Sequence, residues 1–538
     1  MKLFTGPRTA DGTRFAWRFS LVCMTIANNR RFHKHAWIIL AFIALAFRLP
    51  GLVWGKDFYG HGSFCFLHFD EWSASRQILE YTQTGKIGRA DYFYGFPTQI
   101  LWTLRLFWGP LTEIKILLIS RLLSVIFGVA DVLLTYGITR AIFKKRMVAF
   151  LAGIFIALSP LHVTQSHYAT PTISSTFWIY AAFMGCLSFQ ETREIPFLFI
   201  ACISAAAAIA VKFGFITLIP LFYLLWKERH RWPGIAGLSL FVFSFLIWNG
   251  NQTPFRQINS ITKLLLSDNF MMREHHRWLN PFVYGFDLIP GLGLPIFVFA
   301  GIGLAALIKQ GFYNPKRSSK NRVRLICLEL PLFYYAAVLC GMTLPFARHI
   351  LPLLPYLAMV AAYGFMWTVK KRLFRRWAML LFVFVFAYQA FCVGWNEKRF
   401  VLDPFFLARA WVMDHTAENE KVWFAIPNFY AQAFPPKKLA GSYATADYLL
   451  VSERMTMSFR RSSLTPLTNH PALSEGYHLK LLKDPLFLRD VYEGRNGFKP
   501  AAFFGSSEIF PEFWLYKRLF GSYVWRTGDW IIYRREAS

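Results

Sequence analysis

Charged residues are scarce in this sequence of 538 residues, because Asp, Glu, Lys and Arg together make up only 17% of it. Soluble proteins usually carry about 25% charged residues. Acids are the scarcer kind, with 30 Asp and Glu against 59 Lys and Arg and a formal charge of +29. Many basic residues stand in short clusters between apolar runs, as in membrane proteins that follow the positive-inside rule. The sequence therefore predicts an integral protein of the lipid bilayer, and this clustering argues against nucleic acid as its partner.

Signals for disulfides, zinc and secretion are also missing. The seven cysteines show no spacing such as C-x-x-C, and most of them lie inside apolar runs, so we interpret them as small packing residues. The first apolar piece, FSLVCMTIA, ends in NNRR without a small-residue cleavage site, which is not typical of a signal peptide. No internal repeat or low-complexity tract is present.

Long apolar runs are the main feature of the sequence, since hydrophobic residues make up 55% of the chain. A helix that spans a bilayer needs about 20 mostly apolar residues. On that length, the sequence predicts a polytopic α-helical membrane protein with roughly eleven transmembrane helices. The predicted spans cover residues 35–55, 115–139, 147–167, 173–189, 196–212, 213–226, 232–249, 286–308, 325–343, 348–369 and 377–395.

The basic clusters predict the orientation of these spans. They precede the first span and follow the second, sixth, eighth and tenth, so all of them face one side if the N-terminus is cytoplasmic. An odd number of spans then places the C-terminus outside. We expect a multi-pass protein of a prokaryotic cytoplasmic (inner) membrane, with a cytoplasmic segment 1–34, a membrane module 35–395 whose first extracytoplasmic loop covers 56–114, and an extracytoplasmic domain 396–538.

The region after residue 396 has the pattern of a small α/β domain. Asp403-Pro404 is a typical helix start, with Asp as N-cap and Pro at the first helical position, and it opens FFLARAWVMDHTA. Short runs rich in β-branched and aromatic residues follow at VWFAI, from residue 422, and at DYLLVS, from residue 447. These runs predict strands.

Two adjacent acids stand out in the first outer loop, in the stretch FCFLHFDEWSASRQ. Asp70 and Glu71 are flanked there by His68, Phe69 and Trp72. An acid pair in a loop is most simply explained as a solvated surface feature. The aromatic neighbours instead suggest a packed or interfacial environment, where a carboxylate is costly unless it has a partner or a function.

Several further stretches occur in a recognisable order along the chain. FRLPGL ends the first span, HFDEW carries the acid pair, and FYGFPT follows in the same loop. Later come SRLLSVIFGVADVLLTYGITRAIF, ALSPLHVTQSHYATPT, AIAVKFGF and FARHILPLLPYLAMVAAYG. In this order the chain resembles the GT-C fold glycosyltransferases, and among them the protein O-mannosyltransferases and the lipid A aminoarabinose transferases.

This resemblance implies an enzyme that moves a sugar from a polyprenyl-phosphate donor to a lipid, glycan or protein acceptor on the outer face of the membrane. It implies that Asp70 is the general base, which deprotonates the acceptor hydroxyl so that the anomeric carbon is inverted. Glu71 would point about 100° away from Asp70 on a helix. We expect Glu71 to orient the acceptor, bind an ion or pair with a base.

The donor phosphate requires cations, and an ionisable residue within or at the end of a span is a functional candidate. The resemblance implies that Arg348 binds this phosphate, and Lys212 and His349 are further candidates. The alternative for these residues, and for Arg48 and Arg121, is an anchor whose charged end reaches the interface. Asp131 is expected to pair with a base inside the bundle.

The remaining candidates are contacts to the acceptor or the outer loops, at His68, Tyr94 and His167. No metal site is predicted at His275 and His276, because adjacent histidines rarely share one ion, and a divalent ion at Asp70 stays an open alternative. The chain also departs from the family pattern. Many relatives have an aspartate where this sequence has Thr172.

Two other classes of function stay open at the level of the sequence. One is a transporter or flippase for a polyprenyl-linked lipid, although such proteins often show inverted repeats and helices broken at the midplane. The other is a non-catalytic membrane assembly protein that uses the outer domain as a binding module.

Overall fold

The chain is described here by a computed structural model. Within helix α3 the positions of some side chains, among them that of Asp70, lie outside the described part. The described residues are 30–55, 69–84, 100, 112–212, 214–249, 280–310, 329, 331–339, 347–371, 377–424, 433–452, 485–505, 509–520 and 529–536.

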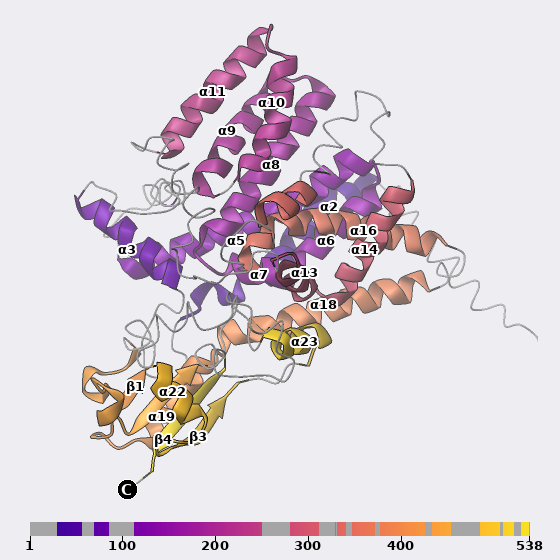
Figure 1. The fold of residues 1–538 in the computed structure, drawn as a ribbon. Coiled ribbons are helices and arrows are strands. Elements are labelled where there is room, and N and C mark those ends of the chain that lie inside the picture. The colour runs from indigo at the N-terminus through magenta and orange to yellow at the C-terminus, as the bar shows by residue number, and fades with distance from the viewer. Residues whose placement is uncertain are drawn as a thin grey trace, which may run out of the picture.

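The described membrane part is a bundle of helices (Figure 1). Its first half contains α2 (Arg30–Ala46), η1 (Pro50–Val53), α3 (Phe69–Thr84), α5 (Glu113–Phe143), α6 (Arg146–Ala157), α7 (Pro160–Ser166), α8 (Pro171–Thr192) and α9 (Ile195–Val211). Its second half contains η2 (Gly214–Thr217), α10 (Leu218–Lys227), α11 (Trp232–Asn249), α13 (Asn280–Leu292), α14 (Leu294–Lys309), the π-helical turn η5 (Tyr334–Leu339), the 3-10 helix η6 (Ala347–Leu353), α16 (Leu354–Lys370) and α18 (Ala378–Val401).

Among the described residues, five helices are long and apolar enough to cross a membrane. Two bent pairs, α6 with α7 and α13 with α14, raise the number to seven if each pair is one span. The helices 195–211, 214–227 and 232–248 are apolar but shorter. A multi-pass helical protein is thus confirmed, whereas the count of eleven spans and their orientation stay predictions.

Local sequence signals explain several helix boundaries. The Thr112 side chain accepts a hydrogen bond from the Lys115 amide and caps α5. Pro160 at the start of α7 follows the bend of 59° that separates α6 from α7. Gly293, at φ +86°, separates α13 from α14, where the direction changes by 117°. Proline and glycine thus break two apolar runs that the sequence presents as single spans.

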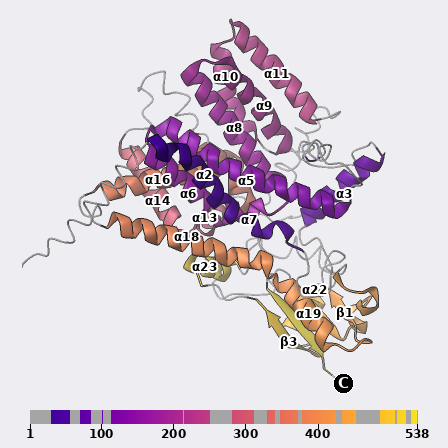
Figure 2. The same cartoon turned by 180° about the vertical axis from the view of Figure 1, so that it is seen from behind.

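The C-terminal part contains a four-stranded mixed sheet, which lies apart from the helical bundle in Figures 1 and 2. Its strand order is β1-β2-β4-β3. β1 runs parallel to β2, and β4 is antiparallel to both β2 and β3. The strands are β1 (Val422–Phe424), β2 (Tyr448–Ser452), β3 (Phe498–Phe504) and β4 (Trp530–Arg535), and the helices are α19 (Pro404–His415), η8 (Pro436–Lys438), η9 (Tyr443–Thr445), α22 (Pro485–Tyr492) and α23 (Pro511–Phe520). The predicted strands at 422 and 447 and the helix start at Asp403 are confirmed.

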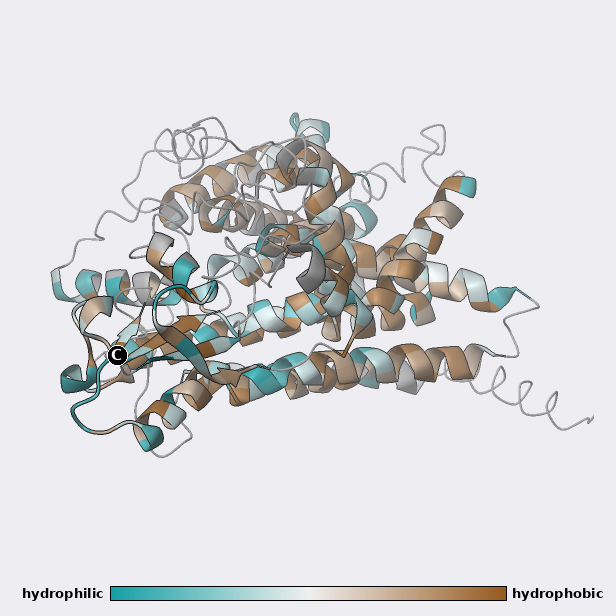
Figure 3. Ribbon diagram, turned by 60° about the horizontal axis from the view of Figure 1, so that its bottom comes forward, coloured by the Kyte–Doolittle hydropathy of each residue, from teal (hydrophilic) through white to brown (hydrophobic). Residues whose placement is uncertain are grey.

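The C-terminal part packs against the same end of the bundle that carries the start of α3. Trp54 lies in one apolar cluster with Tyr168 and with Phe405 of α19. Its indole Nε1 donates a hydrogen bond of 2.8 Å to Asp403 Oδ2, while Asp403 Oδ1 caps α19. Figure 3 shows apolar residues along most bundle helices and more hydrophilic residues in the C-terminal part.

Helices α14 and α16 cross at two glycines. A Cβ added to Gly303 would lie 2.0 Å from the Val360 carbonyl oxygen, and one added to Gly364 would lie 2.2 Å from the Phe299 oxygen. Small residues at such a crossing let two helix backbones approach closely, which is a common way to pack helices in a membrane.

We therefore expect Gly303→Val to destabilise the protein by about 1–3 kcal/mol or more, because a larger side chain meets backbone that cannot yield. Gly301→Val on the same helix is the matched control, since a Cβ there meets nothing within 4 Å. Thermal unfolding in detergent measures both variants. Equal melting temperatures would contradict the close crossing.

Candidate active site

Glu71 and Arg121 form a fully buried ion pair that joins α3 to α5. Arg121 Nε donates to Glu71 Oε1 at 2.9 Å and Nη2 donates to Oε2 at 2.7 Å, and both side chains are 0% exposed. Glu71 Oε1 also accepts the Ala169 amide at 2.7 Å, and Arg121 Nη1 donates to the Trp54 carbonyl. The bidentate geometry and the added hydrogen bonds satisfy both charges.

This ion pair decides between the roles predicted for Arg121 and for Glu71. Arg121 is not an interface anchor, because it is buried and paired. Of the roles expected for Glu71, the structure bears out pairing with a base. Because the carboxylate already accepts three hydrogen bonds, it has little remaining capacity to take a proton from an acceptor.

Asp70 lies in the first turn of α3, one residue before Glu71. Figure 1 shows α3 between the α8–α11 group and the C-terminal sheet. The helix also packs on the bundle further along, since Ile78 lies in one apolar cluster with Ile116 and Val211. The backbone of Asp70 is therefore held by α5 and lies on a helix that reaches the end of α9.

Lys212 follows Val211 at the end of α9 and is buried, with 7% of its surface exposed. Its ammonium donates a hydrogen bond of 3.2 Å to the Thr172 hydroxyl, and the Ser175 hydroxyl donates to the Lys212 carbonyl at 2.5 Å. The position where many relatives have an aspartate is thus occupied by a neutral hydroxyl that contacts this lysine. Lys212 is thus a buried cation at the end of α9, which α3 approaches. A buried cation in this position is a suitable partner for an anionic group.

The connection between α7 and α8 organises these contacts. Within a few residues, Ala169 donates to Glu71 and Thr172 accepts from Lys212. His167 lies beside Glu397 of α18, with 3.0 Å between Nε2 and Oε2. One short segment therefore contacts α3, the end of α9 and the last long helix of the bundle.

His167 is fully buried and stacks on Phe400 at a ring distance of 4.8 Å. Gly51 leaves room for its ring, since a Cβ there would lie 2.1 Å from His167 Cδ2. The role of His167 as an acceptor contact stays a prediction. Glu397 was not singled out from the sequence, although an acid directly after an apolar span, in WNEKR, is a signal that could have found it.

Arg348 and His349 lie in η6, at the start of α16. His349 is buried, and its Nδ1 lies 3.2 Å from the Tyr284 hydroxyl. Arg348 is half-buried. The Tyr180 hydroxyl of α8 donates to the Pro352 carbonyl of η6 at 2.8 Å. Tyr180 lies about two turns beyond Thr172, through which α8 contacts Lys212. The eight residues from Thr172 to Tyr180 correspond to about 12 Å along the helix.

A second buried network, which the sequence interpretation missed, lies between α2, α5 and α7. Arg48 is 0% exposed and donates to the Ala157 carbonyl at 3.1 Å and to His162 Nδ1 at 2.9 Å. Because a guanidinium only donates, Nδ1 accepts and Nε2 carries the proton that faces Asp131 Oδ2 at 3.3 Å. The interpretation of Arg48 as an interface anchor is wrong, and the pairing predicted for Asp131 is confirmed.

Five residues named in the sequence analysis lie outside the described part of the chain. They are His68, Tyr94, His275, His276 and the side chain of Asp70. Among the described residues, no group of three or more His, Cys, Asp or Glu side chains could hold a metal ion. The alternative of a divalent ion at Asp70 therefore stays open.

Part of this chain matches a known protein family. The family model of dolichyl-phosphate-mannose-protein mannosyltransferases matches residues 87–255. No curated protein sequence matches the chain. Among solved structures, the apo oligosaccharyltransferase of Archaeoglobus fulgidus shares the fold, with a TM-score of 0.50 and 11% identity over 94% of this chain and 89% of that one.

Two further structures are similar at lower scores. ArnT from Cupriavidus metallidurans, bound to undecaprenyl phosphate, has 12% identity and a TM-score of 0.47 over 79% of this chain and 94% of that one. The mycobacterial arabinofuranosyltransferase AftD has 13% identity and a TM-score of 0.39 over 95% of this chain and 42% of that one. The predicted resemblance to GT-C fold glycosyltransferases is confirmed by the family model and by the fold shared with the oligosaccharyltransferase of Archaeoglobus fulgidus.

We expect Glu71→Ala to loosen α3, because removal of one partner leaves Arg121 buried and uncompensated at a cost of about 3–5 kcal/mol. Hydrogen exchange across α3 should then be faster than in the native protein. Glu80→Ala is the control, since Glu80 is an exposed acid of the same helix. Equal exchange in the two variants would mean that the ion pair does not hold α3.

Proposed function

We propose that this protein is an integral membrane glycosyltransferase that moves a sugar from a polyprenyl-phosphate donor to an acceptor hydroxyl at the extracytoplasmic face, with inversion of the anomeric carbon. The observation that carries the proposal is the Glu71–Arg121 pair, which holds the start of α3 against the bundle on the side of Lys212. The match of residues 87–255 to a family named for a polyprenyl-phosphate mannose donor supports the same chemistry.

In this proposal Asp70 is the general base. The acceptor oxygen attacks the anomeric carbon while its proton passes to the Asp70 carboxylate, and the bond from that carbon to the phosphate oxygen breaks. The polyprenyl phosphate leaves as an anion. Because attack occurs opposite the leaving group, the configuration inverts. Glu71 is a positioning residue that holds the helix on which Asp70 stands.

The leaving phosphate requires positive charge, which Arg348 and Lys212 supply in this proposal. Lys212 is already buried and oriented by Thr172, so little reorganisation is needed when an anion arrives. His349, held by Tyr284, completes the site at the start of α16. The long isoprenoid tail would remain in lipid beside the bundle, with its phosphate at the interface.

The outer location follows from the predicted orientation, with the C-terminal part on the same side as the site. The contact between Trp54 and Asp403 supports this arrangement, because it joins the end of the first predicted span to the start of α19. The acceptor remains a lipid, a glycan or a protein, and the sugar is a hexose or a pentose. The match to a transferase family favours an enzyme over a transporter or a non-catalytic assembly protein.

We expect Asp70→Asn to fold normally and to lose transfer by about 100-fold or more, the usual scale for a lost general base. Transfer from a panel of polyprenyl-phosphate sugars by the purified full-length protein is the measurement. Glu80→Gln removes a comparable charge from the same helix and should retain activity. A fully active Asp70→Asn variant would exclude this mechanism.

For Arg348→Ala we expect weaker donor binding, seen as an increase in the donor KM of about 10-fold, because one cation near the phosphate is lost. Lys227→Ala, at the exposed end of α10, is the matched loss of one positive charge and should leave the KM unchanged. An unchanged KM in Arg348→Ala would mean that Arg348 is an interface anchor and does not bind the donor phosphate.

A further inference from the structure

A pocket of about 720 Å³ lies at the other end of the bundle from the candidate active site. It is lined by Lys144 and Lys145 between α5 and α6, by the first residues of α6, by Gln310 after α14, and by Tyr363, Trp367 and Lys370 on α16. Its lining contains four cations and no acid.

The course of four helices fixes the position of this pocket. α5 carries Arg121 near its start and ends at the pocket, and Arg121 and Lys144 are about 34 Å apart along its axis. α6 begins at the pocket and ends where the Ala157 carbonyl accepts from Arg48. α16 begins after Arg348 and ends at the pocket, and α8 runs from Thr172 to Glu191, which pairs with Lys144. The separation is comparable to the hydrocarbon core of a bilayer, about 30 Å thick.

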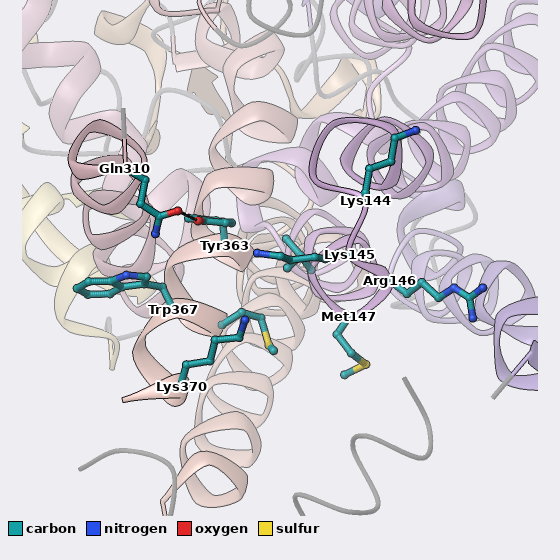
Figure 4. A pocket seen from close by; sticks show the side chains of 10 residues that line it. Lys144, Lys145, Arg146, Met147, Gln310, Tyr363, Trp367 and Lys370 are labelled. Carbon is teal, nitrogen blue, oxygen red and sulfur yellow. Dashed lines mark hydrogen bonds between the residues drawn. The ribbon is translucent and has the colours of Figure 1, made fainter. Parts of the chain in front are cut away.

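The polar groups of the pocket converge. In Figure 4 the ammonium groups of Lys145 and Lys370 point toward the ring of Tyr363, whereas Lys144 and Arg146 extend away from it. Lys145 Nζ lies 5.3 Å from the Tyr363 ring centre, and the Tyr363 hydroxyl donates to Gln310 Oε1 at 2.6 Å. Burial, and then the charge of Lys370, lower the pKa of Lys145. The two like charges in this pocket thus repel each other.

Among the described residues, Lys145 and Lys370 have no carboxylate as an ion-pair partner. Lys144 is neutralised by Glu191 at 2.6 Å, but no described carboxylate forms an ion pair with Lys145 or Lys370. The sequence that follows Gln310 adds five basic residues and no acid up to Leu328. An anion would therefore gain attraction from both lysines and relieve their mutual repulsion.

The surroundings of the pocket indicate that it lies at the depth of the lipid headgroups. Ile308, two residues before Gln310, is 62% exposed, as expected for a lipid-facing side chain at the end of a span. Trp367 and Tyr363 lie one turn apart on α16, and aromatic residues of this kind gather where a membrane meets water. Basic pockets between transmembrane helices are typical sites for anionic lipid headgroups.

We propose that this pocket binds the phosphate headgroup of an anionic phospholipid from the leaflet opposite the active site. Lys145 and Lys370 would hold the phosphate oxygens, and Tyr363, Trp367 and Gln310 would form the wall against which the headgroup packs. Such a lipid would join the end of α5 and the start of α6 to the ends of α14 and α16. The proposal does not depend on the transfer reaction, since it concerns a different end of the molecule.

Native mass spectrometry of the full-length protein, titrated in detergent with phosphatidylglycerol, tests this proposal. We expect one phosphatidylglycerol to bind more tightly than phosphatidylcholine. In the double variant Lys145→Gln, Lys370→Gln its affinity should fall by about 30-fold, because each lysine near an anionic lipid contributes about 1 kcal/mol. Lys227→Gln, Arg229→Gln removes the same charge at the same end of the bundle and should bind like the native protein.

Three results would overturn the proposal. Equal losses in the two double variants would mean a general surface attraction without a local site. Equal binding of phosphatidylglycerol and phosphatidylcholine would exclude charge recognition. Displacement of the lipid by millimolar inorganic phosphate would mean that a soluble phosphate is the ligand. If the double variant does not fold, Lys370→Gln alone, a change at an exposed side chain, should still weaken binding by about 5-fold.

Discussion

The buried pair of Glu71 and Arg121 is the constraint on which the arrangement of α3, α5 and the connection between α7 and α8 depends. Two charges without solvent persist only if their hydrogen bonds are satisfied, and here Ala169 and Trp54 complete the set. A well-packed apolar pair could be as stable, so the value of this pair lies in position: it fixes one rotation and one register of α3 on α5. In our account this constraint fixes the position of the Asp70 backbone, next to Glu71.

Two ends of one bundle thus acquire different chemistry. At one end, the connection between α7 and α8 brings together α3, Lys212 and α18, while the C-terminal sheet packs beside them. At the other end, helices α5, α6, α14 and α16 surround a pocket rich in lysine. The close crossing at Gly303 and Gly364 lies between the two ends and holds α14 against α16. The proposed sugar donor and the proposed structural lipid would therefore bind from opposite leaflets.

Sequence patterns predicted what depends on composition and on local signals. Apolar runs predicted the helical bundle, Asp403-Pro404 predicted the start of α19, and ordered motifs predicted the GT-C resemblance. Patterns failed where the answer depended on distant partners. Arg48 and Arg121 resemble interface anchors in isolation, because the groups that bury them lie 50 or more residues away. The contact between Thr172 and Lys212 likewise joins two helices and leaves no local signal in the sequence.

The most direct test of the account is a double-mutant cycle between Glu71 and Asp70, measured as the rate of sugar transfer. If Glu71 acts only by placing Asp70, Glu71→Gln should slow transfer by about 10-fold or more in the native background and should leave the residual rate of Asp70→Asn unchanged. Independent effects that multiply in the double variant would contradict the claim that the buried pair serves the reaction through its neighbour.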